Sequence, residues 1–187
     1  MSFRNVITTL GVLAAIAAPA TVAHAHPETT RLAPAAVRPV GPDADFLIAA
    51  HQANLAQMKL GKLALRKGGS ATIRDLGRQF AAYHRKLDAG VTKAATTLDV
   101  NLPKAPNSEQ KMLLKQYRAA DGAEFDTLFV GSQLIAHEHA IKLAKIVLAT
   151  GTEPAVRHIV AAATPVIQKH HDALAAAQQR IGDAADQ

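Results

Sequence analysis

Residues 70–98 read SATIRDLGRQFAAYHRKLDAGVTKAATTL, and their apolar side chains recur every three or four positions. This spacing predicts a helix with one buried face. Ser70 is a good N-cap for it. Gly68 and Gly69 separate this helix from another helical segment at residues 43–67. Because so short a turn joins them, the two helices are predicted to pack antiparallel.

Three further helices are predicted downstream. Ser108 is expected to cap a short helix that ends near residue 119, after a loop with two prolines at residues 100–107. The sequence Asp121-Gly-Ala-Glu124 resembles a capping box and opens a long helix to about residue 150. The last helix opens at residues 152–154 and is expected to end near residues 181–182. The predicted fold is all-α: an antiparallel up-and-down four-helix bundle over residues 43–182, with a short extra helix before the third long helix and a tail at 183–187.

The first 25 residues have the pattern of a secretory signal peptide. They contain Arg4, an apolar run at residues 6–18 and an Ala23-His24-Ala25 cleavage site. That run is too short to span a bilayer well. Cleavage after Ala25 predicts a periplasmic or secreted protein with no transmembrane segment left. Residues 26–42 contain four prolines and are predicted to be a disordered linker.

Composition limits the classes of partner and cofactor. The chain has no cysteine, which excludes disulfides and thiolate metal sites. It also has no tryptophan, only 4% aromatic residues, and a net charge of +6 without a basic block. These features argue against a nucleic-acid partner. An envelope component or a second copy of the chain remains open as a partner.

The predicted buried faces carry polar residues near mid-helix. These residues are Gln57, His84 and His170, while the third long helix has two phases, of which one buries His137 and the other His139. Each lies roughly 21 to 26 Å from its helix start at about 1.5 Å per residue, so antiparallel packing is expected to bring them to one level. The buried face of residues 43–67 is predicted to be Phe46, Ala50, Ala53, Gln57, Leu60 and Ala64.

Several stretches resemble the family of domain of unknown function 4142, which belongs to the ferritin-like superfamily. They are DFL at 45–47, QMKLGKLA at 57–64, FAAYH at 80–84, GAEFD at 122–126, AH at 136–137 and TPVIQKH at 164–170. The resemblance covers about residues 43–182. It implies that His84, His137, His170 and Asp126 occupy recurrent polar positions of the family, which selects the phase that buries His137. Gln57 stands where the family usually has Glu, and Tyr83 where it usually has Asp.

These departures bear on metal chemistry. Di-iron sites of ferritin-like bundles use four carboxylates and two Glu-x-x-His pairs, and this chain has no Glu-x-x-His. An oxygen-activating enzyme is therefore not expected. Three imidazoles suit one transition-metal ion, Zn, Cu or Fe, with Gln57, Asp126 or water completing the shell. Asp126 precedes His137 by 11 residues, about 16 Å along a helix, which argues against a shared layer. Imidazole nitrogens more than about 8 Å apart could not share an ion.

The remaining polar residues suggest weaker sites. His51 and Asn54 are expected to face solvent or a helix contact, and Asp88 could orient His84 from four residues away. Surface or helix-contact positions are expected for His139, His158 and His171, and His26 would become a copper-chelating amino terminus after cleavage.

Two functions follow from the sequence. The first is a non-catalytic, exported ferritin-like bundle of the cell envelope that acts in stress tolerance or as an interaction module. The alternative is a mononuclear metal-binding protein that uses His84, His137, His170 and Gln57. No catalytic residue is predicted.

Overall fold

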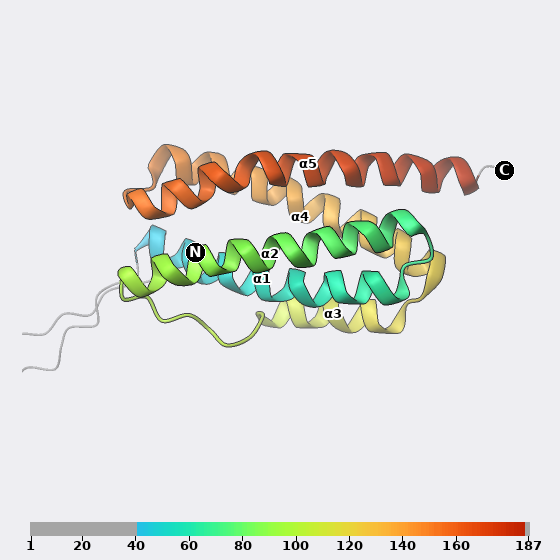
Figure 1. Cartoon of the computed structure of the whole chain (residues 1–187), viewed down its shortest axis with the longest axis horizontal. Coiled ribbons are helices and arrows are strands. Elements are labelled where there is room, and N and C mark those ends of the chain that lie inside the picture. The colour runs from blue at the N-terminus through green and yellow to red at the C-terminus, as the bar shows by residue number, and fades with distance from the viewer. Residues whose placement is uncertain (1–40, 186–187) are drawn as a thin grey trace, which may run out of the picture. The chain divides into compact units, whose positions relative to one another are not determined.

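The computed structural model describes residues 41–185, so the predicted signal peptide and all but the last two residues of the predicted linker lie outside the described range. The described residues form five helices and no β-sheet, which confirms the all-α class. None of these helices is long and apolar enough to cross a membrane. Their bounds are α1 Pro42–Lys67, α2 Ala71–Thr97, α3 Ser108–Ala119, α4 Gly122–Thr150 and α5 Pro154–Ala185 (Figure 1).

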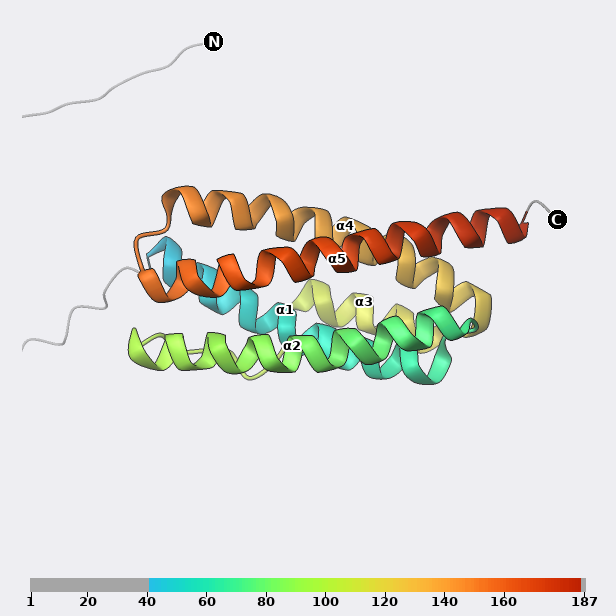
Figure 2. The ribbon, with the colours of Figure 1, turned by 45° about the horizontal axis from the view of Figure 1, so that its top comes forward.

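The long helices pair as two antiparallel hairpins, α1 with α2 and α4 with α5 (Figures 1 and 2). Glycines allow the close approach of α1 and α2: a Cβ on Gly77 would lie 2.6 Å from the Cβ of Ala64 and 2.8 Å from the carbonyl oxygen of Gly61. Side chains at this crossing would therefore force the two helices apart.

An aspartate from each hairpin caps the turn of the other. Asp126, near the start of α4, accepts hydrogen bonds of 2.8 Å from the backbone N–H groups of Gly69 and Ser70, just before α2. The carboxylate satisfies donors at a helix N-terminus that would otherwise lack partners. Asp126 thus fastens the α1–α2 turn to α4.

Asp43, near the start of α1, does the same for the α4–α5 turn. Its carboxylate accepts hydrogen bonds from the backbone and hydroxyl of Thr152 and from the backbone of Glu153, at 2.8 to 3.1 Å. Burial raises the pKa of Asp43, but these hydrogen bonds outweigh that effect and hold the pKa below its usual value. The ionised carboxylate therefore fastens the α4–α5 turn to α1.

The two caps repeat at one spacing. Asp126 lies 83 positions after Asp43, and the residues that Asp43 caps lie 83 positions after those that Asp126 caps. Arg74 and Arg157, again 83 positions apart, each donate to the glycine carbonyl that ends the preceding helix. The two hairpins therefore close each other by the same contacts.

Replacing Asp126 by alanine should lower the free energy of unfolding by about 1 to 3 kcal/mol, because the backbone N–H groups of Gly69 and Ser70 lose a charged acceptor. Urea unfolding measures this change. The control is Glu124→Ala, which removes an exposed acid from the same turn of α4 and should cost only a few tenths of a kcal/mol. Equal losses in the two variants would show that the cap does not stabilise the fold.

Helix starts differ in two places from the sequence prediction. Asn107, not Ser108, caps α3, and its side chain forms a capping box with Gln110. Asp121 stands at the N-cap of α4 but makes no capping hydrogen bond. Its carboxylate accepts from Lys67 Nζ at 2.8 Å instead, so the predicted capping box is wrong. The ammonium group of Lys67, on α1, is the partner of this carboxylate in place of the backbone N–H groups of α4.

The end of α5 also differs. The helix continues through Gly182 to Ala185, beyond the predicted end near residues 181–182. A single glycine lowers helix stability by only about 1 kcal/mol relative to alanine, which is too little to stop a long helix. Of the predicted tail, residues 183–185 are helical, and residues 186–187 lie outside the described range.

The buried face of α1 is only partly the one predicted. Leu60 and Ala64 are buried as expected, whereas the predicted Phe46, Ala50, Ala53 and Gln57 are half-buried. Leu47, Asn54 and Gly61 are buried instead, seven residues apart from one another. Because α1 contacts α2, α3 and α4, its burial extends over more than one face.

The apolar core consists of two clusters at opposite ends of the long helices. One is built around Phe80, Val130 and Leu174 and includes the buried side of α3. The other is built around Val91, Ala144 and Val160. Along α2, α4 and α5, the segment between the two clusters contains His84, His137 and His170 respectively. The polar layer thus lies between two apolar clusters.

Candidate metal centre

Three histidines from three helices meet in the interior. His84 of α2, His137 of α4 and His170 of α5 each offer a ring nitrogen, and these nitrogens all lie within 4.8 Å of one another. All three residues are buried, with 4 to 8% of their surface exposed. The common level expected from helix depth is therefore confirmed for these three histidines. Nitrogens bound tetrahedrally to one ion at about 2.05 Å would be about 3.4 Å apart, so binding would require the rings to move closer together.

The phase of α4 is the one that buries His137. Its Nδ1 lies 2.8 Å from the backbone oxygen of Gln133, one turn earlier, whereas His139 is exposed. Since a carbonyl can only accept, Nδ1 carries the proton and Nε2 keeps a free lone pair. His137 is thus held in a tautomer that can bind a metal through Nε2.

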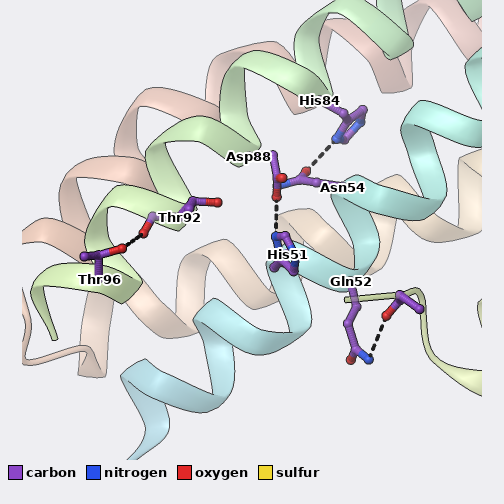
Figure 3. Close-up of polar contacts among 8 residues, drawn as sticks. His51, Gln52, Asn54, His84, Asp88, Thr92 and Thr96 are labelled. Carbon is purple, nitrogen blue, oxygen red and sulfur yellow. Dashed lines mark hydrogen bonds and ion pairs between the residues drawn. The ribbon is translucent and has the colours of Figure 1, made fainter. Parts of the chain in front are cut away.

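A chain of hydrogen bonds orients His84 (Figure 3). Its Nδ1 lies 2.8 Å from Oδ1 of Asn54, and Asn54 Nδ2 donates to Asp88 Oδ1 at 3.4 Å. The same Asp88 oxygen lies 2.8 Å from His51 Nδ1. Because Asp88 holds the Asn54 amide with its oxygen toward His84, Nδ1 of His84 carries the proton and Nε2 is left as a lone pair.

This arrangement corrects two sequence interpretations. Asp88 does not pair with His84 directly but acts through Asn54, and it binds His51. Asn54 is only 2% exposed and lies at a contact between α1 and α2, so the solvent-facing alternative is wrong. His51 is half-buried at the same contact.

Two of the imidazole nitrogens have no partner. His84 Nε2 and His170 Nδ1 are both buried without a hydrogen bond among the described residues. The His170 ring packs against Phe80, with ring centres 4.4 Å apart, and meets Tyr83 edge-on at 5.3 Å. Buried polar atoms without partners are costly and call for an explanation, such as an ion.

Burial keeps the three imidazoles neutral. It lowers the pKa of His84 to about 3, and the neighbouring His137 and His170 act in the same direction. Burial likewise lowers the pKa of His170 to about 4, with help from His137 and Lys169. For His137 burial also lowers the pKa, against the opposing hydrogen bond to the Gln133 carbonyl. Neutral imidazole is the form that ligates metals.

Gln57 and Asp126, the other two residues predicted to complete the metal shell, make hydrogen bonds elsewhere. Gln57 Nε2 donates to Gln133 Oε1 at 2.7 Å, and Gln133 Nε2 donates to the Tyr117 hydroxyl at 3.3 Å. Gln57 lines the same cavity as His84 and His137. Asp126 binds the α1–α2 turn, away from the histidines, as its distance along α4 predicted.

The remaining histidines stand apart from this group. His158 is exposed, and His171 is half-buried with Glu138 and Asp172 within 4 Å of its ring nitrogens. His24 and His26 lie outside the described residues. No carboxylate joins the three clustered histidines within residues 41–185.

The sequence interpretation missed Asn54 and Tyr117 as part of the polar interior. A weak signal for Asn54 existed, since Leu47, Asn54 and Gly61 follow one another at intervals of seven, the spacing of one helix face. Tyr117 lies on α3, and its hydroxyl contacts Ser132 and Gln133 of α4. Nothing in the local sequence predicts that contact.

Comparison with known proteins identifies a family but no characterised relative. No curated protein and no solved structure matches the chain. A family model described as "Domain of unknown function (DUF4142)" matches residues 27–177, more than three quarters of the sequence. The chain belongs to the DUF4142 family.

Proposed function

We propose that this protein binds one transition-metal ion, Zn, Cu or Fe, through His84, His137 and His170. The observation that carries the proposal is the meeting of three buried ring nitrogens from three helices within 4.8 Å. Two of the rings are held in a defined tautomer by Asn54 and by the Gln133 carbonyl. Outer hydrogen bonds of this kind are a usual feature of metal-ligating histidines.

The donor set favours particular chemistry. Three neutral imidazoles suit Zn(II) and Cu(II) better than the hard, oxygen-preferring cations. Three protein ligands also leave a fourth position for water or another small ligand. A site of this kind fits metal buffering, sensing or transfer, and we infer no catalytic step.

The 83-residue spacing that relates the two hairpins supports a role for His84 and His170 beyond packing. The position 83 residues after His84 is Ile167, and the position 83 residues before His170 is Leu87. The corresponding positions of the other hairpin thus hold aliphatic residues. Since the same fold accommodates apolar side chains there, stability alone does not explain histidine at positions 84 and 170.

The proposal also covers the type of fold that holds the site and the location of the protein. We infer that α1, α2, α4 and α5 form an up-and-down four-helix bundle of the ferritin-like kind, with α3 as the extra helix. The signal-peptide pattern of residues 1–25 supports export to the periplasm or the medium. The metal ion would then be bound in the cell envelope.

A second candidate is a non-catalytic interaction module of the envelope. It is favoured by an apolar strip on α4, where Ile135, Leu143 and Ile146 are 57, 42 and 58% exposed. Large exposed apolar side chains on one helix face are typical of contacts with other molecules. The two functions are compatible, because the strip and His137 occupy different faces of α4.

Metal analysis tests the proposal. The chain beginning at His26, purified without an affinity tag, is loaded with Zn²⁺ and dialysed. One equivalent per chain is expected, together with a rise in melting temperature of several degrees. Less than a tenth of an equivalent, with no shift in melting temperature, after the same loading with Zn²⁺, Cu²⁺ and Fe²⁺ in turn, would exclude the metal function.

Replacing Asp88 by asparagine should weaken Zn²⁺ binding by about tenfold, because the Asn54 amide loses the charged acceptor that orients it toward His84. Competition with a chromophoric chelator measures the affinity. Asp75→Asn is the matched control, since Asp75 is an exposed residue of the same helix that pairs with Arg78 and not with the histidine cluster. The same affinity in both variants would contradict an orienting role for Asp88.

A further inference from the structure

A largely apolar cleft adjoins the histidine cluster. Its volume is about 340 Å³, near the lower end for ligand sites. Residues from all five helices line it, α3 contributing only Gln110 among the described residues. Small side chains predominate on α1 and α4: Ala49, Ala50, Ala53, Ala136, Ala140 and Ala144. The exposed residues His139 and Leu143 also border the cleft, which marks its opening to solvent.

The two ends of the cleft differ in chemistry. Gln57, His84 and His137 line one end of the cleft. At the other end lie Phe46, about three helical turns from Gln57 on α1, and Val91, about two turns from His84 on α2. Eleven residues separate Phe46 from Gln57 on α1, which corresponds to about 16 Å. The cleft therefore suits an elongated ligand with one polar end.

Two buried atoms at the polar end are without partners. They are Nε2 of His84 and Oε1 of Gln57, each on a residue that lines the cleft. The first is a candidate metal ligand. Together they indicate that this end of the cleft holds polar groups that the described residues do not supply.

Charge decides the kind of polar group. No Asp, Glu, Lys or Arg lines the cleft, and no carboxylate joins the three histidines among the described residues. A divalent ion on three neutral imidazoles would thus keep its full charge in an apolar interior, which is unfavourable without a counter-ion. An anionic ligand on the fourth position would neutralise half of that charge.

We propose that the cleft binds an aliphatic monocarboxylate, whose carboxylate takes the fourth position on the metal and whose alkyl chain lies between α1 and α4. This inference rests on the proposed metal site. The alkyl chain of the ligand would extend from the histidines toward Phe46 and Val91 and displace water from the alanine-rich walls of the cleft.

Gln57 can donate a hydrogen bond to the second oxygen of the carboxylate, the one that does not bind the metal. Its amide is bonded to the amide of Gln133, and turning both amides over together preserves a hydrogen bond between them. Gln57 Nε2 then occupies the place of Oε1, and Gln133 Oε1 can accept from the Tyr117 hydroxyl. Gln57 would in that state donate to the bound carboxylate.

The test uses Co²⁺ as the probe metal, since its visible spectrum reports a change in the fourth ligand. Co²⁺-loaded protein is titrated with acetate, butyrate, hexanoate and octanoate. The affinity should rise about fourfold for each added methylene until the cleft is full. 1-Hexanol has the same tail without the charge and should bind at least about tenfold more weakly than hexanoate.

Matched variants place the ligand in the cleft. Ala140→Leu fills the cleft and should abolish the gain with chain length, whereas Ala149→Leu, at an exposed site of the same helix, should not change it. Both should still bind Co²⁺. An affinity independent of chain length, or equal binding of hexanol and hexanoate, would overturn the proposal. A chain that binds no Co²⁺ would instead refute the metal site on which it rests.

Discussion

His170→Leu should lose Zn²⁺ binding, by more than about 100-fold, and leave the metal-free protein as stable as the wild type or about 1 kcal/mol more stable. The metal loses one of three protein ligands, while the fold loses a buried nitrogen that has no hydrogen-bond partner among residues 41–185. Leucine is the natural choice because Leu87 stands at the corresponding position of the other hairpin. Loss of the ring contact with Phe80 offsets part of the gain.

The matched control is the neighbouring residue. His171→Leu changes a half-buried histidine outside the cluster and should keep the full Zn²⁺ affinity. Chelator competition gives the affinities, and urea unfolding in the presence of EDTA gives the stabilities. A His170→Leu protein that binds zinc like the wild type would refute the site. A loss of more than about 2 kcal/mol without metal would show that His170 serves the fold.

The metal-free protein should lose stability steeply as the pH falls from 6.5 toward 4. Folding holds the pKa of His84 at about 3 and that of His170 at about 4, whereas both titrate near 6.5 in the unfolded chain. The unfolded chain therefore binds more protons in this range, so the stability present above pH 6.5 is lost as the pH decreases. For each histidine that stays neutral in the folded protein, the free energy of unfolding decreases by about 1.4 kcal/mol per unit of pH below 6.5.

The pH range in which the histidines reduce stability differs from the range in which the Asp43 carboxylate does so. Asp43 has a lowered pKa, so its contribution is present above the usual value of 3.8 and is lost only at lower pH. Urea unfolding with EDTA at pH 7, 6 and 5 isolates the histidine range. The His170→Leu protein should show a smaller slope, because one buried neutral histidine is gone. A stability that is constant from pH 7 to 5 would mean that the cluster is hydrated and titrates normally.

Periodicity predicted the inward residues of α2 well because that helix has one buried face. Its predicted inward residues Ile73, Leu76, Phe80, His84 and Val91 are buried, whereas Leu87 and Leu98 of the same predicted stripe are half-buried. The same reasoning was only partly right for α1, which contacts three other helices and therefore buries several faces. A single apolar stripe is a sound expectation only for a helix that packs on one side.

For α4, periodicity left two phases open, and the family resemblance decided between them. Apolar residues occupy both faces of this helix, and the face with Ile135 and Ile146 is exposed. Hydrophobic pattern cannot tell a core face from an exposed apolar strip. His137 rather than His139 is the buried histidine.

The capping aspartates lay beyond local sequence reasoning, since each acts on a turn of the other hairpin. Asp43 contacts residues more than 100 positions away. Yet a signal was present in the repeat, because Asp43 and Phe46 recur as Asp126 and Phe129 at the spacing of 83. The link from Asp88 through Asn54 to His84 likewise depends on the docking of α1 against α2.

Anomalous diffraction from a crystal of the Zn²⁺-loaded protein tests the central claim most directly, because it locates the ion itself. We predict one peak inside the protein, about 2.0 to 2.1 Å from one ring nitrogen of each of His84, His137 and His170. A fourth, non-protein ligand should complete the shell on the side of the cleft. A Zn²⁺-loaded crystal with no anomalous peak at these histidines, or with zinc bound only at surface residues such as His158, would contradict the claim.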